Sequence, residues 1–200
     1  MGQRLAVIFE HEEQPIAAIY YHWSAYTVPA LLIADDLITA WDDCSDKEPW
    51  QTKLLNVIRF VRANRGGMDY YAEGREHEAA KAMYPNEIFP AEGYDRNHGL
   101  IALTPEGINA IISAAEGEIV INVDERTIFN TVVNAWESKE ELMEAYDGYS
   151  EKEIDKAPRI NIDLSYMTFA ELPYAMDVFL NYPDDYLFVH DDLIFEIIGW

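Results

Sequence analysis

Residues 4–21 read RLAVIFEHEEQPIAAIYY, and this stretch decides the fold class. Residues 4–10 and 15–21 are rich in β-branched and aromatic side chains, and the polar HEEQ of residues 11–14 separates them. Two such runs joined by a short polar segment predict a β-hairpin. A second hairpin and several helical patterns follow along the chain. We therefore predict an α+β fold of antiparallel hairpins packed with several helices, and not a doubly wound parallel sheet.

The segments that follow this hairpin predict helices. Ser24 and Thr27 are candidate N-caps, and Pro29 suits a first helical turn. A helix is therefore expected over residues 30–41. A second helix is expected over residues 49–64, where apolar residues recur at helical spacing. The apolar stripe of this second helix consists of Leu54, Leu55, Ile58 and Val61.

The rest of the chain predicts shorter elements. They begin with a short helix over residues 73–83, a long loop over 84–98, a strand over 99–103, a helix over 104–115 and a hairpin of 118–123 with 127–134. They continue with a helix to about residue 146 that starts at the capping box of Ser138 and Glu141, a strand over 159–164, a helix over 168–181 bent at Pro173, and a strand over 186–198. Residues 147–158 are a charged connection. They mark a candidate boundary inside what is otherwise expected to be one domain spanning residues 1–200.

Composition narrows the class of protein. Half of the 200 residues are hydrophobic and 13% are aromatic, which is enough to build a sizeable core. The sequence contains no run of about 18 apolar residues and no signal-peptide pattern at its start. Cys44 is the only cysteine, which excludes an internal disulfide and a thiolate zinc site. These features predict a cytoplasmic protein without a membrane partner.

Charge is the strongest compositional signal. The chain has 37 acidic and 14 basic side chains, for a net charge of -23, and residues 101–200 hold 21 acidic against five basic ones. Such a field repels nucleic acid and anionic membranes and favours basic partners. Either the carboxylates mimic DNA phosphates, or the acidity serves solubility. Both interpretations stay open at this point.

An aromatic block covers residues 20–27, where a strand is expected to pass into a helix N-terminus. Such a junction offers backbone N–H groups to an anion, and the neighbouring rings can stack on a base. The candidate ligand-binding residues here are Tyr21, His22, Trp23, Ser24, Tyr26 and Thr27. In the alternative interpretation, the aromatic side chains belong to the core and the hydroxyls only cap the helix.

Two basic segments add candidate anion-binding residues. Residues 49–68 contain no acid, and Arg59 and Arg62 are neighbours on the predicted helix, where guanidinium groups suit phosphate or carboxylate. Alternatively, these arginines complement the helix dipole and pair with nearby acids. The loop before residue 99 holds three polar residues able to contact a ligand, or simply forms a turn. These loop residues are Arg96, Asn97 and His98.

Three of these segments also carry a resemblance. The Arg-Leu-x-Val of residues 4–7, the Tyr-Tyr-His-Trp-Ser-Ala-Tyr-Thr of residues 20–27 and the Arg-Asn-x-Gly-Leu-Ile of residues 96–101 together resemble a family of small accessory proteins encoded by tailed bacteriophages. The acidic C-terminal half shows no such likeness. The resemblance implies a phage protein that counters host defence in the host cytoplasm, and it brings no established activity with it.

Catalytic and metal-binding motifs are not found in the sequence. Adjacent acids such as Asp35-Asp36 and Asp42-Asp43 have none of the spacing of a calcium loop or a zinc helix, and no phosphate-binding loop is present. His22 and Ser24 do not form a catalytic dyad on sequence grounds. We therefore predict no catalytic residue, no metal ion and no cofactor.

Three functional hypotheses follow. The first is a non-enzymatic anti-defence protein that sequesters a small anionic, nucleotide-derived host immune signal between the aromatic block and the arginines. A homodimer would suit this hypothesis, since sequestering proteins often build pockets at subunit interfaces. The second is an acidic inhibitor that occupies the nucleic-acid channel of a basic host defence enzyme. The third is a hydrolase or lyase that acts on a nucleotide ligand, with His22 or His98 as the acid or base.

Overall fold

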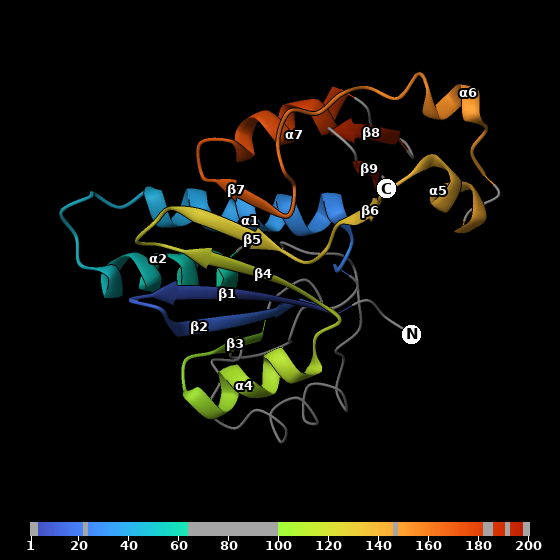
Figure 1. Cartoon of the computed structure of the whole chain (residues 1–200). Helices are drawn as coiled ribbons and strands as arrows, with labels where there is room; N and C mark the ends of the chain where they lie inside the picture. Colours follow the sequence, from blue (N-terminus) through green and yellow to red (C-terminus); the bar gives the residue numbers. More distant parts are fainter. Residues whose placement is uncertain are drawn as a thin grey trace.

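A six-stranded mixed β-sheet with helices on both faces forms the larger part of the computed structural model (Figure 1). The structure describes residues 4–21, 24–63, 100–145, 148–181, 186–190 and 193–197. The strand order is β3-β2-β1-β4-β5-β7, and a second sheet has the order β6-β9-β8. The predicted α+β class is confirmed.

The predicted first hairpin is confirmed and lies inside the large sheet. Strands β1 (Leu5–His11) and β2 (Gln14–Tyr21) pair antiparallel around a two-residue turn. Both turn residues, Glu12 and Glu13, have positive φ angles of 49° and 59°, as a type I′ turn requires. On its other side, β1 pairs parallel with β4 (Gly117–Asn122), which was not predicted.

The remaining strands complete the two sheets. In the large sheet, β3 (Leu100–Ala102) pairs with β2, β5 (Thr127–Asn130) pairs with β4, and β7 (Tyr166–Thr168) pairs with β5, all antiparallel. The small sheet consists of β6 (Asn134–Trp136), β9 (Leu193–Ile197) and β8 (Tyr186–His190). The second hairpin, β4 with β5, is confirmed, although β5 ends at residue 130 and residue 134 already belongs to the small sheet.

The helices cover the two faces of the large sheet unequally. One face packs against α1 (Thr27–Asp42), α2 (Trp50–Ala63) and α7 (Leu172–Asn181). On the other face, the one helix among the described residues is α4 (Pro105–Ala114), which contacts β2 and β3 (Figure 1). Helices α5 (Lys139–Ala145) and α6 (Glu151–Ile154) accompany the small sheet. None of the described helices is long and apolar enough to cross a membrane.

Strand alternation in the large sheet produces two of the three hydrophobic clusters among the described residues; the third lies between the small sheet, α5 and α6. Residues Leu5, Val7 and Phe9 of β1 face α1, α2 and α7, and the Phe9 ring stacks on Trp41 with 5.7 Å between centroids. The intervening residues of β1 face α4 instead, and form a smaller cluster with it. The larger cluster also includes Phe188 and Phe195 of the small sheet, so the two sheets share one hydrophobic core.

Several helix predictions need correction. Helix α1 begins at Thr27, with Tyr26 as the N-cap and no side-chain capping bond, so neither Ser24 nor Thr27 caps it as expected. Helix α2 matches its predicted span, but Leu55 is exposed and Val57 takes its place among the buried residues. The expectations for α4 are confirmed, since Thr104 Oγ1 accepts a hydrogen bond from Gly107 N at 3.2 Å.

Several predictions for the C-terminal part of the chain are wrong. Residues 159–164 form no strand apart from a single bridge between Arg159 and Val189. Pro173 lies in the first turn of α7, where it starts the helix and does not bend it. The expected final strand is a hairpin, β8 with β9. The charged connection contains α6, and the predictions for residues 73–83 and 84–98 fall outside the described residues.

Helix α1 carries two acids without a described cationic partner, Asp35 and Asp36. Burial raises the pKa of Asp35, and burial together with the charge of Asp35 raises the pKa of Asp36. A raised pKa means that the ionised carboxylate destabilises the folded state at neutral pH, and that this effect disappears as the pH falls below the unfolded value of about 3.9. We therefore expect Asp35→Asn to raise the melting temperature by a few degrees at pH 7 and to leave it unchanged near pH 3. An equal gain at both pH values would contradict the electrostatic origin.

Candidate interaction surface

The structure places most of the described aromatic block inside the protein. Tyr21, Ser24 and Thr27 are buried, and Tyr26 is half-buried. Burial of this kind favours a packing role for these side chains, which was the alternative interpretation of the block. His22 and Trp23 lie outside the described residues, so their expected contact with a ligand stays a prediction.

The predicted arginine cluster is described only in part. Arg59 is exposed on α2, and Arg62 lies one turn further along the same helix. Arg96, Asn97 and His98 lie outside the described residues. Convergence of these arginines with the aromatic block into one pocket therefore stays a prediction.

Several other described cations are engaged by the chain's own acids. Arg126 binds Asp42 through two hydrogen bonds of 2.9 and 2.6 Å, and these lower the pKa of Asp42. The Arg126 guanidinium also lies 4.7 Å from the centre of the Phe169 ring. Other pairs among the described residues are Arg4 with Glu116 at 3.0 Å, Lys53 with Asp46 at 3.5 Å, and Lys139 with Asp155. Because these cations are paired with acids and the chain has 37 acidic against 14 basic side chains, many carboxylates have no cation to balance their charge.

No helix of the described part of the chain lies over one portion of the large sheet, on the α4 side. Helix α4 covers this face at β2 and β3 but does not extend to β5 and β7 (Figure 1). A cross-strand row runs over the uncovered part, from Val120 on β4 to Phe129 on β5 and Tyr166 on β7. Phe129 is 48% exposed and Tyr166 is 52% exposed, both large values for aromatic residues in a sheet. We call these three residues the open row.

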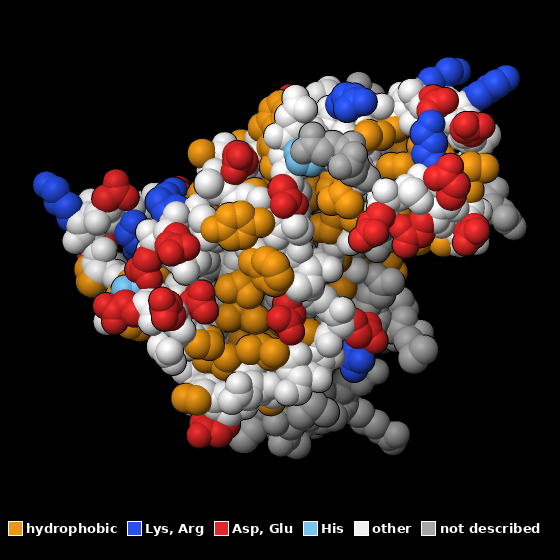
Figure 2. Space-filling model, viewed as in Figure 1, with side chains coloured by type: hydrophobic (Ala, Val, Ile, Leu, Met, Phe, Trp, Pro, Cys, Tyr) orange, Lys and Arg blue, Asp and Glu red, His pale blue; other side chains and the backbone are white. Residues whose placement is uncertain are grey.

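Polar residues lie on both sides of the open row. On one side, Glu10, Asn122, Thr127 and Thr168 follow one another across β1, β4, β5 and β7. On the other side lies Glu118, two residues before Val120 and therefore about 7 Å away along β4. None of these flanking residues is a lysine or an arginine. In the same view as Figure 1, the space-filling model shows hydrophobic side chains in the middle of this face, with acidic side chains and fewer basic ones around them (Figure 2).

The exposed edge of the sheet beside this face is closed to further strands. Tyr166 N donates to Asp163 O at 3.2 Å, and Thr168 N donates to the Glu171 carboxylate at 2.7 Å. Both amides point away from β5, because the bonds to β5 involve the alternate residues of this segment. Thr168 Oγ1 donates to the same carboxylate, and these bonds lower the pKa of Glu171. A partner could use the face of the sheet here, but not strand addition at β7.

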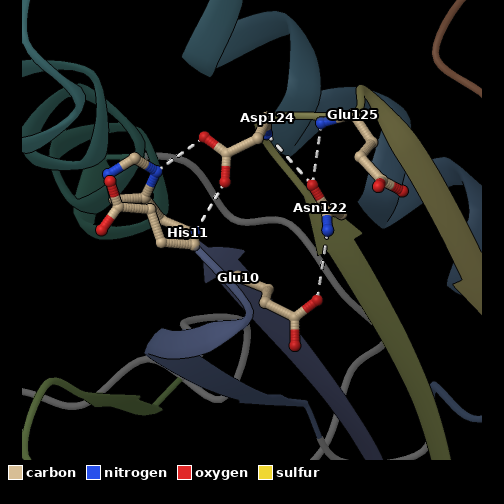
Figure 3. Close-up of polar contacts among 6 residues, drawn as sticks. Glu10, His11, Asn122, Asp124 and Glu125 are labelled. Carbon is tan, nitrogen blue, oxygen red and sulfur yellow. Dashed lines mark hydrogen bonds and ion pairs between the residues drawn. The ribbon is translucent and has the colours of Figure 1, made fainter.

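A network of polar contacts ties the two hairpin turns together at one end of the sheet (Figure 3). Asp124 accepts from Glu12 N at 2.6 Å and contacts His11 Nδ1 at 2.7 Å, and both contacts lower the pKa of Asp124. Asn122 accepts from the backbone amides of Asp124 and Glu125 and donates to Glu10 at 3.3 Å. The polar groups of this network bond to one another and hold the β1–β2 turn in its positive-φ conformation. We therefore assign the network a structural role. Among the described residues, no group of acids, histidines and cysteine is arranged to hold a metal ion.

Sequence reasoning did not identify the open row. The alternation of Thr127, Ile128, Phe129 and Asn130 predicts that Phe129 faces away from Ile128. It does not say which of the two faces a helix covers. Tyr166 lies in a strand of three residues that carries too short a pattern to be recognised. The sequence pattern therefore indicated on which face of the strand each residue lies, but not whether that face is exposed.

Comparisons with protein-family models, with curated proteins and with solved structures find no match to this chain. The likeness to phage accessory proteins is therefore not tested by them.

Proposed function

We propose that the protein acts by binding a basic protein partner, in the manner of an acidic inhibitor that occupies the nucleic-acid-binding surface of a host defence enzyme. The observation that carries this proposal is the partly aromatic face of the large sheet that no described helix covers, flanked by the carboxylates of Glu10 and Glu118, neither of which is paired with a described cation. Exposed apolar patches on soluble proteins commonly mark interaction sites. The net charge of -23 selects partners of opposite charge and speeds their encounter.

Direct binding of nucleic acid by this face is disfavoured by the same charges. Aromatic side chains on a sheet can stack on bases, but the proteins that use them in this way also have a positively charged groove for the backbone. Glu10 and Glu118 occupy the corresponding positions here. A protein that itself binds nucleic acid has the complementary charge, and its own groove would accept these carboxylates in place of phosphates.

The sequestration hypothesis depends on residues that the structure does not describe. Among the predicted ligand-binding residues, only Arg59 is a described and exposed cation. A thermal-shift screen with mono-, di- and cyclic nucleotides separates this hypothesis from the proposed function. Stabilisation of about 2.7 kcal/mol is expected for a ligand at 100 times its dissociation constant.

The proposed function predicts competition with DNA. We expect the protein to displace a fluorescent DNA duplex from at least one basic defence nuclease in a purified panel of restriction and RNA-guided enzymes. Raising the salt from about 50 to about 500 mM should weaken the displacement by on the order of tenfold, because screening shortens the range of the attraction. Fluorescence anisotropy of the DNA measures both effects.

Polyglutamate at the same concentration of charge is the matched control. It should displace DNA much less effectively than the folded protein if a shaped surface contributes. The proposal fails if no nuclease of the panel releases its DNA at low salt, or if binding to a released nuclease is independent of salt.

A further inference from the structure

We infer that the open row is the docking site for an arginine-bearing segment of the basic partner, with a guanidinium group seated on Phe129 and Tyr166 and with the carboxylates of Glu118 on β4 and Glu10 on β1 beside the row. This inference rests on the proposed function and specifies the surface and the chemistry of the contact. Its first support is the geometry of the two aromatic residues.

Phe129 and Tyr166 are direct cross-strand partners. The hydrogen bond of 2.9 Å from Asn130 N to Ser165 O and that of 3.0 Å from Phe169 N to Arg126 O identify the residue pairs that bond across β5 and β7. Phe129 and Tyr166 therefore form a non-hydrogen-bonded pair, whose Cα atoms lie about 4.5 Å apart. Two aromatic side chains leave the same face at close spacing, and both are about half exposed.

An exposed aromatic surface beside carboxylates suits arginine more than other side chains. The planar guanidinium stacks on a ring while its edge donates hydrogen bonds to carboxylates, whereas the lysine ammonium does neither as well. The protein already contains one such arrangement. Arg126 lies 4.7 Å from the Phe169 ring centre and donates two hydrogen bonds to Asp42. The open row offers the ring and the carboxylate to an arginine from outside.

The carboxylates on the two sides of the open row differ in their local contacts. Glu10 receives one long hydrogen bond of 3.3 Å from Asn122. The Glu118 carboxylate has no hydrogen bond or ion pair to any described residue, although its backbone is bonded to Thr131. Neither acid is paired with a described cation. A guanidinium group above the row would therefore gain charge-assisted bonds without breaking an existing ion pair.

Two other occupants fit less well. A strand added to the edge of the sheet is blocked at β7, because the outward amides of Tyr166 and Thr168 are already bonded within the chain. A second copy of this chain would bring Glu10 and Glu118 towards identical carboxylates, and like charges across an interface disfavour association. The charge of the flanking residues therefore selects a cationic partner.

Two synthetic peptides of equal length and charge test the inference, one with the sequence GRLRLRG and the other GKLKLKG. We expect the arginine peptide to bind about five- to tenfold more tightly at low salt, as measured by fluorescence anisotropy. The double variant Phe129→Ala/Tyr166→Ala should lose this preference. Tyr174→Ala is the matched control, because Tyr174 is 47% exposed on α7, and it should keep the preference. Unchanged melting temperatures of the variants exclude loss of the fold as the cause.

The outcomes separate the inference from the proposed function. Equal binding of both peptides, or an arginine preference that survives the double variant, overturns the inference. If the double variant also still displaces DNA from the nuclease as well as the unmodified protein does, the proposed function stands and its surface lies elsewhere. Absence of both peptide binding and DNA displacement removes both proposals. Loss of arginine preference and of displacement in the double variant, but not in Tyr174→Ala, supports both.

Discussion

Phe9→Ala is expected to lower the free energy of unfolding by about 3 to 5 kcal/mol, the usual cost of removing a fully buried phenylalanine ring. Phe9 is 0% exposed and lies at the centre of the larger core. Its ring stacks on Trp41 of α1, so the substitution removes contacts between the sheet and the helix layer as well as apolar burial. Urea unfolding followed by tryptophan fluorescence measures the change, since Trp41 reports on this contact.

The same substitution at Phe129 is the matched control. Phe129 lies on the opposite face of the sheet and is 48% exposed, so its ring contributes much less burial. We expect Phe129→Ala to cost no more than about 1 kcal/mol. A cost at Phe129 as large as the cost at Phe9 would show that another part of the chain covers the open row. The docking inference would then lose its surface.

The contrast between these two phenylalanines shows how far the sequence alone could reach. Both lie in runs whose alternation predicts a strand, and both strands are confirmed. Alternation separates the two faces of a strand but does not identify the face that helices cover. That depends on where α4 ends relative to β4 and β5, which is a property of the whole fold. The open row was therefore beyond the reach of a local pattern.

Sequence patterns predicted correctly those elements whose turns and caps involve residues close together in the sequence. The β1–β2 hairpin, the β4–β5 hairpin and the capped helix α4 were predicted and are confirmed, because their turns and caps lie within a few residues. The parallel pairing of β1 with β4 joins residues more than 100 positions apart and left no local signal. The same applies to β7, a strand of three residues that exists because β5 offers it an edge.

The candidate site also depends partly on features that the sequence shows and partly on packing that it does not show. Residue chemistry suggested an anion site in the aromatic block, but Tyr21, Ser24 and Thr27 are buried in the structure. Side-chain type shows what a residue can bind, whereas its accessibility depends on packing that the sequence does not display. The charge imbalance, in contrast, needs no fold to be informative, and it is the sequence feature on which the proposed function depends most.

Asn130→Ala is expected to lower the free energy of unfolding by about 2 to 4 kcal/mol, because it leaves two backbone groups without their partner. Asn130 is 1% exposed at the end of β5. Its side chain donates to Leu164 O at 3.2 Å and accepts from Val132 N at 2.8 Å. It therefore joins the chain after β5 to the segment that leads into β7, where the sequence predicted a strand and the structure has none.

Asn122→Ala is the control for this prediction, because it removes the same side chain where the bonded amides of Asp124 and Glu125 lie on exposed residues that water can reach. Its cost should be about 1 kcal/mol or less. Since Asn130 also positions the segment before Tyr166, Asn130→Ala should weaken the arginine preference of the peptide assay. Equal losses of stability in the two variants would mean that the buried amide does not hold β7 against the sheet. The open row would then have to be kept in place by the backbone bonds between β5 and β7 and by the packing of Met167 in the core.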